Sequence, residues 1–107
     1  MKISRRKAYP AHDFQRVSRR ALERISLLVS KWLPDGRQSG AEWIARNPTR
    51  DDRRPGSFKV NMRSGRWADS ATGDRGGDLI SLFAYLHRVS QLDALRQIEM
   101  ELRHERA

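Results

Sequence analysis

The sequence predicts a single α+β domain with one long N-terminal helix, a small antiparallel sheet of three strands, and two C-terminal helices. Apolar residues recur every three or four positions over residues 13–32, which is the spacing of an amphipathic helix. They alternate with polar residues over residues 57–62, as in a half-buried strand, and helical spacing returns after Gly77. A chain of 107 residues has the length of one small domain.

The chain is strongly basic. It contains 22 Lys and Arg residues against 13 Asp and Glu residues, for a formal net charge of +9. Such a balance is typical of a small nucleic-acid-binding domain, because cationic side chains neutralise phosphates and release counterions. The alternative is that the arginines are spread over a solvated surface with no ligand. There is no cysteine, so disulfides and thiolate metal sites are excluded.

The start of the chain and its hydropathy predict a cytoplasmic protein that does not enter a membrane. No apolar run approaches the roughly 18–20 residues needed to cross a bilayer. The first residues, "MKISRRKAYPAHD", are basic but lack the apolar segment of a secretory signal. Residues 1–10 carry four cations and no acid, and we expect them to form a flexible basic arm.

The first helix is expected to begin at Asp13, as its N-cap, and to run to Trp32 on a continuous apolar stripe. "LPDGRQSG" then ends the helix, so that helix and linker together occupy residues 11–40. Cationic residues off the stripe would give the helix a second, charged face. They are Arg16, Arg19, Arg20 and Arg24.

Three short strands are expected next, at Ala41–Asn47, Ser57–Met62 and Arg66–Asp69, with "RSG" as the hairpin turn. The polar loop "PTRDDRRPG" separates the first two. Two helices follow, the first capped by Asp78 and the second by Ser90, where Asp93 three residues on makes a near capping box.

The residues give little support for catalysis. His12, His87 and His104 are scattered along the chain, and no Ser-His-Asp order or metal-protease motif is present. Asp51 and Asp52 lie in a loop among arginines, where a solvated charge cluster is the simpler interpretation. We therefore expect a protein that is not an enzyme and has no cofactor.

The glycine-rich stretch "GDRGGD" has the composition of a phosphate-binding loop at a helix start. The Lys-Ser/Thr that ends a Walker motif is replaced here by Asp78 and Leu79. A carboxylate cap would occupy the amides that a phosphate requires. The stretch is therefore interpreted as a tight turn from a strand into a core helix.

A family resemblance covers residues 43–100. The segments "RRPGSFKVNMRSGRW", "GDRGGDLISLF" and "VSQLDALRQI" follow one another as in the zinc-ribbon N-terminal domain of bacterial and phage DNA primases. The similarity is greatest to the degenerate primase-like modules of plasmids, phages and other mobile elements. It implies a zinc-ribbon-like domain over residues 41–107, which would be compact with the first helix.

The chain departs from that family at the metal ligands. Neither the window of the first ligand pair, residues 45–51, nor the second, at Ala68 and Ala71 or Thr72, contains a Cys or His. The resemblance thus implies a ribbon without metal, in which the first helix could supply the missing folding energy. Its core would come from a set of large apolar residues: Trp43, Phe58, Val60, Trp67, Ile80 and Phe83.

In such primases the ribbon helps to engage single-stranded template, while polymerisation takes place in other domains. The resemblance implies a non-catalytic module that binds nucleic acid, with single-stranded DNA favoured, in the replication of a mobile element. The alternative is an adaptor or inhibitor that docks on a primase, a helicase or another DNA-processing complex, and a homodimer is a variant of it.

The residues expected to contact DNA come from three segments. Cations of the loop and the hairpin would share a rim of the sheet, Trp67 could stack on bases, and the arginines of the first helix would extend the footprint. Packing in the core is the alternative role for Trp67. The candidates are Arg46, Arg50, Arg53, Arg54, Lys59, Arg63, Arg66, Trp67, Arg16, Arg19 and Arg20.

Overall fold

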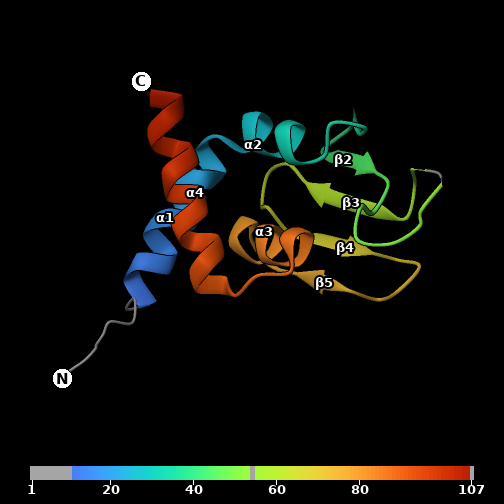
Figure 1. Ribbon diagram of the computed structural model, residues 1–107. Coiled ribbons are helices and arrows are strands. Elements are labelled where there is room, and N and C mark those ends of the chain that lie inside the picture. Colours follow the sequence, from blue (N-terminus) through green and yellow to red (C-terminus); the bar gives the residue numbers. More distant parts are fainter. Residues whose placement is uncertain (1–10, 54, 107) are drawn as a thin grey trace.

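The computed structural model describes residues 11–53 and 55–106, and within them the chain forms four helices and five strands (Figure 1). The strands make one antiparallel sheet in the order β1-β2-β3-β4-β5. Helix α3 packs between the sheet and the pair α1 and α4. The elements are α1 (Ala11–Glu23), α2 (Ile25–Trp32), β1 (Arg37–Ser39), β2 (Glu42–Ala45), β3 (Phe58–Asn61), β4 (Trp67–Asp69), β5 (Arg75–Gly76), α3 (Leu79–His87) and α4 (Gln91–Arg106).

The prediction of one long N-terminal helix is wrong, because the segment breaks at Arg24 into α1 and α2. Arg24 has φ −118° and ψ 24°, which is not helical, and its N–H donates to the carbonyl of Ala21 at 2.9 Å. No glycine or proline marks the break, and the apolar spacing continues through it. Asp13 is also not the N-cap, because α1 begins two residues earlier, at Ala11.

The prediction of a three-stranded sheet is wrong as well. The three expected strands correspond to β2, β3 and β4, and one further strand pairs on each edge. Strand β1 lies in the segment expected to be a linker, where three exposed polar residues show no alternation. It pairs with β2 through a turn at Gly40, which has φ +62°. Strand β5 is only two residues long and lies within "GDRGGD".

Burial divides the sheet into two faces. Phe58 and Val60 of β3 are fully buried and point toward the helices, whereas Lys59 between them is exposed. In β4, Trp67 and Asp69 are buried, and Ala68 is exposed. Successive side chains of a strand point to opposite faces. We call the face that carries Lys59 and Ala68 the outer face of the sheet.

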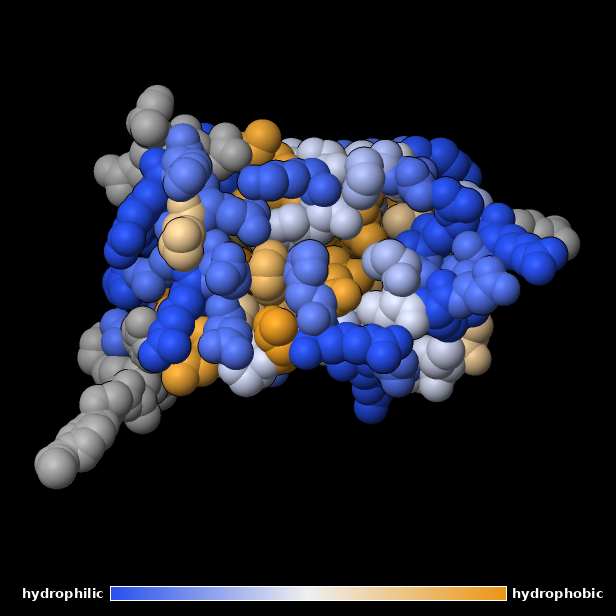
Figure 2. All heavy atoms as spheres, in the orientation of Figure 1, coloured by the Kyte–Doolittle hydropathy of each residue, from blue (hydrophilic) through white to orange (hydrophobic). Residues whose placement is uncertain are grey.

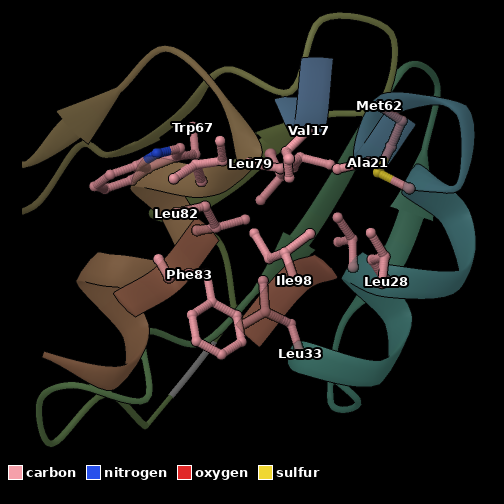
Figure 3. Packing of buried hydrophobic residues seen from close by; sticks show 14 of the residues in the cluster. Val17, Ala21, Leu28, Leu33, Met62, Trp67, Leu79, Leu82, Phe83 and Ile98 are labelled. Carbon is pink, nitrogen blue, oxygen red and sulfur yellow. The ribbon is translucent and has the colours of Figure 1, made fainter. Parts of the chain in front are cut away.

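The core lies between the inner face of the sheet and the helices, and side chains from every layer converge in it (Figure 3). Val17 and Ala21 of α1 are fully buried, as are Leu95 and Ile98 of α4. All the residues expected in the core are buried except Trp43, which is half-buried. Its indole N–H donates to the carbonyl of Leu33 at 3.0 Å.

The two predicted caps of the C-terminal helices are confirmed. Asp78 Oδ1 accepts from the N–H of Ser81 at 2.8 Å, and the Ser81 hydroxyl completes a capping box. Ser90 Oγ accepts from the N–H of Asp93 at 3.0 Å at the start of α4. Among the helices of the described residues, none is both long and apolar enough to cross a membrane.

Candidate nucleic-acid interface

The register of the sheet aligns cationic side chains across its outer face. Arg37 lies opposite Ile44, Ile44 opposite Lys59, Lys59 opposite Ala68, and Ala68 opposite Arg75. This row therefore crosses all five strands and carries three cations. Aligned residues on neighbouring strands lie about 5 Å apart, so the three cations are spread over about 20 Å.

A second row runs beside the first. It contains Ser39, Glu42 and Asn61, which are paired across β1, β2 and β3. Arg66 continues the row, because its carbonyl accepts the N–H of Asn61 at 2.7 Å. The second row thus places an anion, an amide and a cation side by side next to the line of cations.

The two rows border a groove of about 720 Å³ on the outer face. Small residues make much of its lining, so a ligand can approach the strands closely. Hydrophilic residues also gather at the nearby end of the molecule, where the β2–β3 and β4–β5 loops lie (Figures 1 and 2). The lining residues of the groove are Glu42, Ser57, Lys59, Asn61, Arg66, Trp67, Ala68, Ser70, Arg75, Gly76 and Gly77.

The groove has an excess of positive charge that the protein does not neutralise. Lys59, Arg66 and Arg75 are exposed, and none of them takes part in an ion pair within residues 11–53 and 55–106. Glu42 is the single carboxylate among the described residues that line it. Three cations against one anion make the groove a site for an anionic ligand.

Three predicted candidates, Lys59, Arg66 and Trp67, line the groove, and the other candidates lie outside its lining. Arg63 is exposed in the β3–β4 turn. Arg46 forms an ion pair with Asp35, and the exposed Arg53 lies 3.9 Å from Asp51. The candidate Arg54 and the predicted basic arm lie outside the described residues.

Arg50 stabilises the fold and is not free to bind phosphate. Its Nε donates to Asp69 Oδ2 at 3.0 Å, and its Nη2 donates to Ser57 Oγ at 3.0 Å. Burial of Asp69 raises the pKa of its carboxyl, but hydrogen bonds from Arg50, Asn47 and the N–H of Ala71 outweigh burial. They hold the pKa of Asp69 well below its ordinary value.

Trp67 belongs to the core more than to the groove. Only 5% of its surface is exposed, and its ring packs against Tyr85 with centroids 4.6 Å apart. Its indole N–H donates to Ser81 Oγ at 3.0 Å. This enclosure leaves no free ring face for a base, so the structure does not place Trp67 as a stacking residue.

The arginines of α1 belong to a separate surface. Arg16 Nη2 donates to Glu99 Oε2 of α4 at 3.1 Å, which raises the pKa of Arg16. Arg20 borders a small hollow of about 190 Å³ together with Glu23, Arg24 and Leu102. Arg19 is exposed beside them. The helix pair α1 and α4 lies at the end of the molecule away from the strand loops (Figure 1).

Arg37 and Arg75 are not among the predicted site residues, because both lie on edge strands, β1 and β5, that were not predicted from the sequence. The signal available for β1 was the dipeptide Ser39-Gly40, which is typical of a turn and precedes the strand around Trp43. Strand β5 offered no such signal, because two residues among glycines show no periodicity.

Neither a metal site nor a phosphate loop emerges from the described residues. No group of three His, Cys, Asp or Glu side chains in them could hold a metal ion. In "GDRGGD", Asp78 takes the N–H of Ser81, which is one of the amides a phosphate would need. The chain matches no family model, and comparisons with curated proteins and with solved structures find no match.

Proposed function

We propose that the protein is a non-catalytic nucleic-acid-binding module that holds single-stranded DNA in the groove on the outer face of its sheet. The observation that carries the proposal is the set Lys59, Arg66 and Arg75, three exposed cations without ion pairs among the described residues, around one groove. The net charge of +9 supports it, because the whole chain attracts a polyanion.

The binding mechanism is electrostatic. Phosphates contact Lys59, Arg66 and Arg75 and release their counterions, and Arg37 extends the track along the first row. None of these side chains has to leave an ion pair with a described carboxylate before it binds. Binding through them therefore carries no cost of breaking a protein salt bridge, unlike binding through Arg16 or Arg50.

The lining favours a single strand over a duplex. Ser57, Ala68, Ser70 and Gly76 are small, so unstacked bases can lie against the strands while the backbone follows the cations. In a duplex the bases are stacked inside and only groove edges are accessible. The major groove of B-DNA admits slender elements such as a helix or a two-stranded ribbon, whereas here residues of four neighbouring strands, β2 to β5, line the groove.

The resemblance to primase ribbons supports a role in the DNA replication of a mobile element. This chain has no Cys or His in the two windows where those ribbons hold zinc. A protein-docking adaptor would need an apolar helix face that the small sheet leaves uncovered. The apolar helix faces pack on one another, with Val17, Leu95 and Ile98 fully buried. Among the described residues, three large apolar side chains are exposed, and they come from different parts of the fold: Leu27 of α2, Val89 between α3 and α4, and Met100 of α4.

A salt titration tests the proposal. Affinity for a labelled, unstructured single strand is measured between about 50 and 200 mM salt, beside a duplex of the same sequence. Contacts from Lys59, Arg66, Arg75 and Arg37, at about 0.7 per phosphate, predict a log–log slope near 3 and a fall of roughly fiftyfold over that range. The proposal would be contradicted by an affinity that does not change with salt, or by an affinity for an uncharged polymer equal to that for DNA.

A further inference from the structure

Glu42 and Asn61 form a pair on the outer face of the sheet. They are register partners on β2 and β3, and both line the groove. Side chains directly opposite each other on antiparallel strands have Cβ atoms about 5 Å apart, so both can contact one base. Arg66 follows Asn61 in the same row, which places a phosphate-binding cation beside the pair.

The hydrogen-bonding capacity of this pair is defined by the neighbouring turn. Asn61 Oδ1 accepts from the N–H of Arg63 at 2.9 Å and from the N–H of Ser64 at 3.0 Å. Those two bonds fix which end of the amide is oxygen, so the Nδ2 donors remain for a ligand. Within the described residues, neither Nδ2 of Asn61 nor the Glu42 carboxylate has a hydrogen-bond partner.

We propose that Glu42 and Asn61 read a base edge and give the groove a preference for guanine, an inference that rests on the proposed function. The pair offers two carboxylate acceptors and one amide donor. The Watson–Crick edge of guanine presents the complement, two adjacent donors at N1 and N2 and an acceptor at O6. Exposed Watson–Crick edges are the groups by which proteins distinguish unstacked bases.

The other bases match the pair less well. Adenine and cytosine each offer a single amino group as donor beside their acceptors, N1 in adenine and N3 and O2 in cytosine, so one carboxylate oxygen of Glu42 is left without a donor. Thymine offers a single N–H between two carbonyls, which the carboxylate repels. The same charge keeps phosphates away from Glu42, so the backbone is held at Lys59, Arg66 and Arg75 while bases face Glu42.

The experiment compares the affinity of the full chain for a labelled dT12 strand with that for the same strand carrying one central guanine. We expect the guanine to tighten binding about tenfold, the usual scale of bidentate base contacts. Replacing the guanine by hypoxanthine, which lacks only the N2 amino group, should remove much of that gain. A single guanine avoids the quadruplexes that guanine runs form.

Two variants assign the effect to this pair. Glu42→Gln should abolish the guanine preference and slightly tighten binding to dT12, because a negative charge leaves the groove. Asn61→Asp keeps the acceptor for the turn but removes the donor, so the preference should fall while dT12 binding also weakens. Glu23→Gln, an equal charge change at the exposed end of α1, is the control and should retain the preference.

The outcomes separate this inference from the proposed function. Salt-dependent binding with no preference for guanine, or with a preference that survives in Glu42→Gln, overturns the inference and leaves the proposed function intact. Absence of binding to every strand at low salt overturns the proposed function itself. A preference that disappears in Glu42→Gln but not in Glu23→Gln supports the inference.

Discussion

Asn47 Nδ2 donates to Asp69 Oδ2 at 2.8 Å, and this hydrogen bond joins the loop after β2 to the end of β4. Both residues are buried, with 1% and 0% of their surface exposed. Asn47 Nδ2 also contacts the Tyr85 hydroxyl of α3 at 2.8 Å, and Arg50 Nε donates to Asp69 as well. A buried polar network thus connects two loops and a helix.

This network lies where the resemblance to primase ribbons would place metal ligands, within residues 45–51 and next to Ala68 and Ala71. Asp69 Oδ1 accepts the N–H of Ala71 at 2.9 Å, and Asn47 Oδ1 accepts the N–H of Thr49 at 2.9 Å. The side chains therefore organise both loops, as zinc organises the knuckles of a ribbon. These contacts join the two segments directly.

Asp69→Asn is expected to destabilise the fold by about 2 kcal/mol, because it replaces a buried acceptor of several hydrogen bonds with a group that cannot accept them all. The urea midpoint of unfolding, followed by circular dichroism, measures the change. Asp51→Asn is the control. Asp51 is exposed, and its ion pair with the exposed Arg53, at 3.9 Å, is long and contributes little stability. Equal midpoints for the two variants would show that the network contributes no stability.

Acid should weaken this network. Because the folded-state pKa of Asp69 is lowered, the unfolded chain binds the proton more readily, and the contribution of Asp69 is present above its unfolded pKa. That contribution is lost progressively as the pH falls below about 4. The difference in stability between the wild type and Asp69→Asn should therefore shrink between pH 6 and pH 3. A constant difference would contradict the assigned ionisation.

The groove predicts which cations matter for DNA. Changing Lys59, Arg66 and Arg75 together to Gln should weaken binding to a single strand and lower the log–log salt slope by about 2, at about 0.7 per phosphate contact. Changing Arg19 and Arg20 of α1 and Arg24 at the break after it to Gln removes the same charge outside the groove and should leave most of the slope. Fluorescence anisotropy over a salt series measures both. Equal losses would mean that only net charge matters.

Several elements of the fold could be predicted from the sequence because local patterns determine them. The alternation of Phe58, Lys59 and Val60 correctly predicted a strand with Lys59 on the exposed face, and the capping residues Asp78 and Ser90 marked both helix starts. The break at Arg24 and the edge strands could not be predicted, since tertiary packing and pairing create them without a local signal.

The candidate site, like the fold, could be predicted from the sequence only in part. Composition predicted a cationic surface, but only the register shows that Arg37, Lys59 and Arg75 share a row. Charge alone also could not separate Arg50, which is held by Asp69, from Arg66, which is not paired with a described carboxylate. That distinction depends on contacts between residues far apart in the sequence.

Gly76 provides a test of how the floor of the groove is built. A Cβ added there would lie 2.4 Å from Nε1 of Trp67 and 2.5 Å from Oγ of Ser81, the two atoms that share a hydrogen bond. Trp67 is buried and cannot move aside easily, so Gly76→Ala should destabilise the fold by about 2 kcal/mol through overpacking. The control is Gly77→Ala, where an added Cβ meets no atom within 4 Å.

The measurements for this pair are the urea midpoint and tryptophan fluorescence. Gly76→Ala should lower the midpoint and change the emission of Trp67, because the indole loses its contact with Ser81. Gly77→Ala should match the wild type in both. If the two alanine variants behave alike, β5 is not packed on Trp67. The edge of the sheet that carries Arg75 would then not be held in the register that forms the groove.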